Sequence, residues 1–89
     1  MKLTIAGKSW ERRVVNRLIA DGEPCDGDCL HEKHVIRICR GLEPRNEMET
    51  DIHESLHAMF PWLQEWWVQQ AGRDLTALLF DKLHYRREE

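Results

Sequence analysis

The sequence has no long apolar run, little net charge and few cysteines, and each absence narrows what the protein can be. No segment approaches the ~18 consecutive apolar residues typical of a membrane-spanning helix, so no membrane partner is expected. Residues 1–10 also lack the apolar stretch of a secretory signal. The formal net charge of −3 disfavours a nucleic-acid partner, because such binding depends on neutralising phosphates.

The three cysteines are an odd number and cannot all pair within the chain. Without an export signal, reduced thiols and a cytoplasmic location are expected. Cys25 and Cys29 lie close in the sequence to His31 and His34, and these four ligands are one hypothesis for a structural zinc site. Their spacing is not that of a familiar zinc knuckle, and the alternative is a turn that binds no metal.

The length of 89 residues predicts a single domain, 1–89, and 42% hydrophobic residues suffice for a small core. Residues 2–5 and 10–18 predict a β-hairpin, and the alternating segment 34–40 predicts a third, half-buried strand. Residues 21–31 are dense in Gly, Pro and Asp and are predicted to form a loop. Residues 1–44 are therefore expected to form a three-stranded antiparallel sheet.

Residues 45–83 carry the spacing of two helices. Asn46 can cap the first helix, with Glu49 three residues later as in a capping box. Apolar residues recur every three or four positions up to Met59, and Pro61 ends the helix.

The second helix is predicted from about Trp62 to Lys82, with Trp67 on its apolar side and residues 84–89 as a fraying tail. The fold class is thus α+β, a small sheet followed by a helical hairpin. Three tryptophans lie in this part of the chain, Trp62, Trp66 and Trp67. As an alternative to a place in the core, they could line a groove or form the contact surface of an oligomer.

The residues with the clearest chemistry form an HExxH motif, from His53 to His57, inside the first predicted helix. Residues four apart share one helix face, so the two imidazoles can bind one Zn²⁺ at ~2.0–2.1 Å. Glu54 points about 100° away, which suits a general base acting on water better than a ligand. The alternative is a solvated helix face with two titrating histidines.

A catalytic zinc usually has three protein ligands, and the second helix offers Glu65 and Asp74. In an antiparallel hairpin that turns near Pro61, Glu65 lies level with His57, whereas Asp74 lies more than a turn beyond His53. Glu65 is therefore the expected third ligand. Asp74 remains the alternative ligand or a supporting partner.

Two further residues follow the second helix. Tyr85 or His84 can supply a donor to a developing oxyanion, although a plain surface position is the alternative for each.

Motifs spread over residues 35–86 resemble those of a known family. They are Ile36-Arg37-Ile38, Glu49 to Ala58, Phe60-Pro61, Leu63-Gln64-Glu65 to Val68, Arg73-Asp74-Leu75 to Leu79, and Tyr85-Arg86. The pattern resembles the short, phage-type, zincin-like metallopeptidases, or minimal gluzincins. The resemblance implies His53, His57 and Glu65 as zinc ligands, with Glu54 as the base and Asp74 at a recurrent position. It also implies a phage protein, and if the protein is phage-encoded, the expected cytoplasmic location is the cytoplasm of the host.

The leading hypothesis is therefore a zinc-dependent metallopeptidase that cleaves a peptide or protein substrate. An extended peptide is expected to pair with an exposed edge of the sheet. One alternative is a non-catalytic module that zinc stabilises, and another is a metal-free interaction domain.

Overall fold

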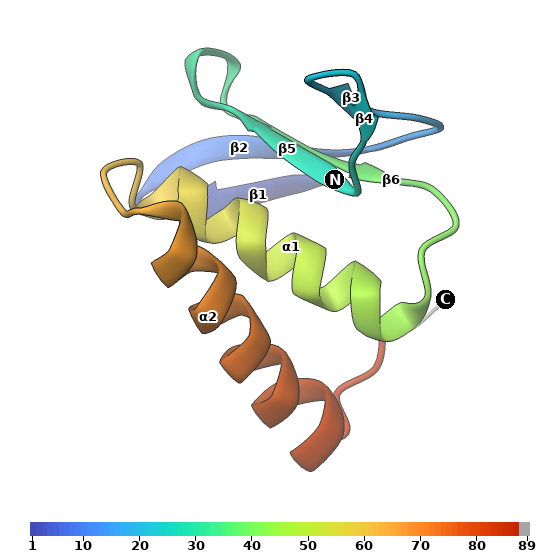
Figure 1. Ribbon diagram of the computed structural model, residues 1–89. Coiled ribbons are helices and arrows are strands. Elements are labelled where there is room, and N and C mark those ends of the chain that lie inside the picture. Colours follow the sequence, from blue (N-terminus) through green and yellow to red (C-terminus); the bar gives the residue numbers. More distant parts are fainter. Residues whose placement is uncertain (88–89) are drawn as a thin grey trace.

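The computed structural model describes residues 1–87 and shows a sheet with two helices packed in succession beneath it (Figure 1). The helices are α1 (Pro44–Met59) and α2 (Glu65–Thr76), followed by a π-helical turn, η2 (Ala77–Lys82). The strands are β1 (Lys2–Ile5), β2 (Lys8–Val15), β3 (Ile19–Ala20), β4 (Glu23–Pro24), β5 (Gly27–Leu30) and β6 (Val35–Cys39), with a 3-10 turn, η1 (His31–Lys33), before β6. The predicted α+β class is confirmed.

The main sheet has four strands in the order β1-β2-β6-β5 and is mixed, so the prediction of three antiparallel strands was wrong. β1 and β2 form the predicted antiparallel hairpin, but β6 runs parallel to β2. Parallel neighbours need a long connection, and residues 16–34 provide it through the small β3-β4 sheet and β5.

Strand β5 lies inside the segment 21–31 that composition predicted to be a loop. It pairs antiparallel with β6, Cys29 opposite Ile36 and Asp28 opposite Arg37, and the Arg37 guanidinium also binds the Asp28 carboxylate. Gly and Asp disfavour strands in isolation, but β6 supplies the ladder and the cross-strand ion pair that hold β5 in place. β5 is therefore an edge strand of the main sheet.

The core lies between this sheet and α1. Ile36 and Ile38 of β6 are fully buried, and Trp10 and Ile5 extend the apolar surface toward β1. Ala58 brings the end of α1 against this cluster.

A buried arginine fixes α1 on the sheet. Arg12 of β2 is only 7% exposed. Its Nε donates to Asp51 Oδ1 at 2.6 Å, and one terminal nitrogen donates to Asp51 Oδ2 at 3.0 Å and to Glu47 Oε2 at 2.9 Å. The two acceptors lie one helical turn apart on α1, so the planar guanidinium sets the position and the rotation of the helix together.

The start of α1 differs from the predicted cap. The helix begins at Pro44, a favoured first position for proline, and Glu43 precedes it without a side-chain capping bond. Asn46 is inside the helix, and its side-chain amide donates to Asp26 Oδ2 at 3.1 Å, just before β5. The predicted capping box of Asn46 and Glu49 was therefore wrong, because Asn46 bonds to a residue distant in the sequence.

The second helix is shorter than predicted, and the face that it buries is not the predicted one. α2 and η2 cover residues 65–82, so residues 62–64 lie outside the helix. Trp67 is 51% exposed, and the prediction that it belongs to the core was wrong. The buried positions are instead Val68, Gly72 and Thr76, spaced four apart.

These smaller side chains let α2 approach α1 closely. A Cβ on Gly72 would lie 3.9 Å from the Glu49 carbonyl oxygen and 4.0 Å from His53 Cβ. An indole does not fit such an interface, so the tryptophans face outward.

The C-terminal segment returns to the start of α1. Residues 84–87 are exposed, and Arg87 forms a 2.7 Å ion pair with Glu47. The rest of the predicted fraying tail, 88–89, lies outside the described residues. Within residues 1–87, none of the helices has the length and apolar character needed to cross a bilayer.

The Arg12 contacts predict a large stability difference between two neighbouring arginines. Arg12→Met should lower the free energy of unfolding by about 2 kcal/mol, because it leaves Asp51 without a cation in a partly buried site and leaves Glu47 with only the exposed Arg87. Arg13→Met is the matched control, since Arg13 is exposed and its one ion pair within residues 1–87 is with Glu11, and it should cost less than ~1 kcal/mol. Urea unfolding of both variants checks this, and equal losses would contradict the role of Arg12.

Candidate metal centre

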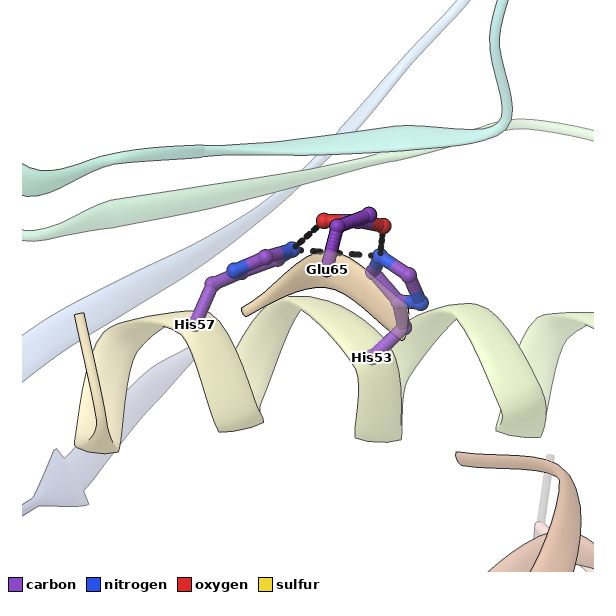
Figure 2. A group of neighbouring side chains, drawn as sticks. All are labelled: His53, His57 and Glu65. Carbon is purple, nitrogen blue, oxygen red and sulfur yellow. Dashed lines mark hydrogen bonds and ion pairs between the residues drawn. The ribbon is translucent and has the colours of Figure 1, made fainter. Parts of the chain in front are cut away.

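The HExxH histidines lie on one face of α1, as their spacing predicted. His53 Nε2 and His57 Nε2 are 3.2 Å apart, and both rings point away from the helix axis toward the same space (Figure 2). Each side chain is 22% exposed, so the rings are accessible without being fully solvated.

Glu65 completes the cluster from the first residue of α2. Its Oε1 lies 2.8 Å from His53 Nε2, and its Oε2 lies 2.7 Å from His57 Nε2 (Figure 2). The short connection after α1 turns the chain back, which places the start of α2 beside the end of α1 as the hairpin geometry predicted. Asp74 is exposed on α2 and accepts a hydrogen bond from Gln70 instead.

The three side chains fit a zinc ion in both chemistry and spacing. Two imidazole nitrogens and one carboxylate oxygen lie within 4.8 Å of one another, the only such group among residues 1–87. Ligand atoms on a tetrahedral zinc with bonds of 2.0–2.1 Å are about 3.3 Å apart. The separations in this structure, 2.7–3.2 Å, are slightly shorter, so small side-chain movements suffice to admit the ion.

The electrostatics of His53 also favour a ligand role. Burial lowers the pKa of His53, and the Glu65 carboxylate only partly opposes this effect. The ring therefore tends to be neutral, and the neutral imidazole is the form that binds metals.

Glu54 lies beside the cluster and not in it. It is 7% exposed, and none of the described hydrogen bonds or ion pairs involves its carboxylate. Burial raises the pKa of Glu54 to about 7, and the negative charges of Asp28 and Glu65 add to the effect. No side-chain oxygen of the described residues is both fully buried and without a partner, so the Glu54 carboxyl group is open to the groove that it lines. An ionisable group with a raised pKa in such a groove is a common feature of functional sites.

The cluster sits in an open groove made of two adjoining cavities of about 370 and 250 Å³. Both cavities are lined by Gly27, His53 and Glu54. One wall is the edge strand β5, and the other carries Glu65, Gln69 and Arg73, which are spaced four apart on α2.

Gly27 is what allows β5 to come so close to α1. A Cβ at this position would lie 2.6 Å from Thr50 Cγ2, 2.8 Å from the Arg37 carbonyl oxygen and 3.2 Å from Glu54 Cγ. Only glycine fits there, and the strand backbone covers Glu54 directly. The burial of Glu54 therefore depends on this contact.

Other predicted site residues lie elsewhere. Tyr85, the predicted oxyanion donor, is 59% exposed and lines neither cavity of the groove, and His84 is exposed beside it. Trp66 and Trp67 stack on each other at the surface with ring centroids 4.3 Å apart, and neither lines the groove.

The four residues proposed for a structural zinc site do not come together. His34 stacks on Trp10 with centroids 4.8 Å apart, and the Cys25 carbonyl accepts from the Cys39 thiol. Only Cys29 and His31 reach the groove, where they line the larger cavity with His57 and Glu65. Cys29 lies on β5 and His31 begins the 3-10 turn that follows, and the prediction of a loop over residues 21–31 gave no indication that the two side chains share the groove.

The chain matches no protein-family model, no curated protein and no solved structure.

The contact at Gly27 predicts that a single methyl group will disturb the site. Gly27→Ala should lower the free energy of unfolding by about 1–3 kcal/mol, because Thr50 and the Arg37 carbonyl are both held in the packed interior. Gly72→Ala is the control, since its Cβ meets only ordinary contacts in a helix and should be neutral or stabilise by about 0.5–1 kcal/mol. Chemical denaturation distinguishes the two, and a harmless Gly27→Ala would show that β5 does not press on α1.

Proposed function

We propose that this protein is a zinc-dependent metallopeptidase-like hydrolase. The observation that supports this best is the convergence of His53, His57 and Glu65 in an open groove beside a buried carboxyl group without a protein partner, Glu54. Nitrogen and carboxylate ligands in a three-ligand set leave a coordination position free, as in catalytic zinc sites.

In this proposal each residue has a distinct role. His53, His57 and Glu65 hold Zn²⁺, which when bound acts as a Lewis acid that polarises a carbonyl group and activates water. Glu54 accepts a proton from the attacking water and delivers it to the leaving amine. Its position under β5 keeps bulk water from its carboxylate while one side faces the groove.

The substrate class follows from the strand that borders the groove. β5 is an edge strand of the main sheet, and its residues Gly27 and Asp28 line the cavity that contains the histidines. An extended peptide can add to such an edge through backbone hydrogen bonds, which places a peptide bond beside Glu54. We therefore propose a peptide or protein substrate lying along β5.

The second candidate function is a zinc-stabilised module that cleaves nothing. An ion held by His57 and Glu65 would join α1 to α2, and a domain with so small a core gains much from such a link. The exposed Trp62, Trp66 and Trp67 would then serve a partner or a second copy of the chain. Glu54 favours hydrolysis over this alternative, because burying an unpaired carboxyl group adds nothing to a structural site.

The proposed ligand set predicts an order of zinc affinity among four variants. His53→Ala, His57→Ala and Glu65→Ala should each weaken zinc binding by more than the ~10–100-fold seen when only a supporting residue is lost. Asp74→Ala is the matched acidic control on the same helix and should bind zinc like the unchanged protein, because the Asp74 carboxylate lies outside the cluster and accepts a hydrogen bond from Gln70. Metal analysis after dialysis and calorimetric titration measure this order. A greater loss in Asp74→Ala than in Glu65→Ala would identify Asp74 as the third ligand.

The proposed base predicts a separation of binding from turnover. Glu54→Gln should keep its zinc content and lose roughly 10²–10⁴-fold in hydrolysis, since the amide cannot accept the proton. Cleavage of a quenched-fluorescent peptide library by the zinc-loaded proteins measures the loss. Unchanged turnover in Glu54→Gln would remove Glu54 as the base, and a zinc-loaded protein that cleaves no peptide would favour the structural module.

A further inference from the structure

A second pair of metal-binding side chains lies in the same groove, outside the cluster described above. Cys29 is on β5 and His31 opens η1, so both come from the wall opposite α2. Cys29 Sγ and His31 Nε2 are 3.6 Å apart, and both residues line the cavity that also contains His57 and Glu65.

The separation of this pair matches two ligands on one tetrahedral ion. A zinc–sulfur bond of 2.3 Å and a zinc–nitrogen bond of 2.0–2.1 Å place the two ligand atoms about 3.6 Å apart. The side chains therefore have the spacing of ligands without any movement of the backbone. His31 is exposed and Cys29 is half-buried, so an ion can reach the pair from the solvent.

The pair does not have the character of a catalytic thiol. Burial raises the pKa of the Cys29 thiol to about 11, and the carboxylates of Glu54 and Asp28 contribute. A cysteine nucleophile needs the opposite shift. The same negative charges favour a cation beside the sulfur, because a divalent ion displaces the thiol proton and is itself attracted to the carboxylates.

We propose that Cys29 and His31 bind a second, thiophilic divalent cation such as Zn²⁺ at the β5 wall of the groove, separate from the ion at His53, His57 and Glu65. Solvent water fills the remaining coordination positions, and the thiol proton is released to the solvent. Because both ions share one cavity, the second ion obstructs the groove, so excess zinc inhibits hydrolysis. That last consequence alone rests on the proposed function.

Cobalt(II) titration tests the pair directly, since a thiolate ligand adds a near-ultraviolet charge-transfer band that His and Glu ligands do not give. The unchanged protein should bind a second equivalent of Co²⁺ with this band. Cys29→Ser should lose both the band and the second equivalent, and His31→Ala, a change at an exposed position, should weaken the second equivalent more than tenfold. Cys39→Ser is the matched control, because its thiol donates to the Cys25 carbonyl and lines neither cavity of the groove.

A double variant, His53→Ala with His57→Ala, separates the two sites. The thiolate band should remain in this protein while the first equivalent of Co²⁺ is lost. The test of the Cys29–His31 site therefore does not depend on whether the protein is a hydrolase. Absence of the band in the unchanged protein, or its persistence in Cys29→Ser, overturns the inference. Loss of the band in the double variant also overturns it, because Cys29 would then share a single ion with the histidines.

Discussion

The pairing of Arg12 with Asp51 and Glu47 is the interaction on which the rest of the structure depends. It joins a buried cation on the sheet to two acceptors on α1, and so fixes which side of that helix faces the sheet. At about 100° per residue, the HExxH histidines then point away from Arg12 and toward the edge strand β5, into the groove. Around the helix axis, Glu54 lies between the face that contacts Arg12 and the face that carries the histidines, so it is close to the sheet and still open to the groove. A different rotation of α1 would turn the same motif toward solvent or into the core.

Small residues bring the walls of the groove close to that helix. Gly27 lets the β5 backbone lie on Thr50 and Glu54, and this contact contributes to the burial that raises the pKa of Glu54. On the other wall, α2 packs on α1 through its buried positions Val68 and Gly72, which helps bring Glu65 within reach of the histidines. The chemistry proposed for the groove therefore depends on residues that carry no functional group.

Much of the candidate site could be predicted because it depends on local rules. The spacing of four residues placed His53 and His57 on one helix face, and the break at Pro61 implied a hairpin. The geometry of that hairpin then favoured Glu65 over Asp74, and the structure brings Glu65 to both rings. Each step needed only helix periodicity and the antiparallel arrangement of two consecutive helices, which short connections enforce.

The sequence by itself determined the α+β class, the first hairpin, and the helix that carries the motif, because each follows from periodicity within a short window. Only the tertiary structure decided that the Gly- and Asp-rich segment forms β5, since β6 supplies its hydrogen bonds from outside that window. It likewise turned Trp67 outward, because the close approach of α2 to α1 selects small residues. Cys29 and His31 reached the groove, and Tyr85 did not, for the same reason: long-range pairing, not local pattern, sets where each segment lies.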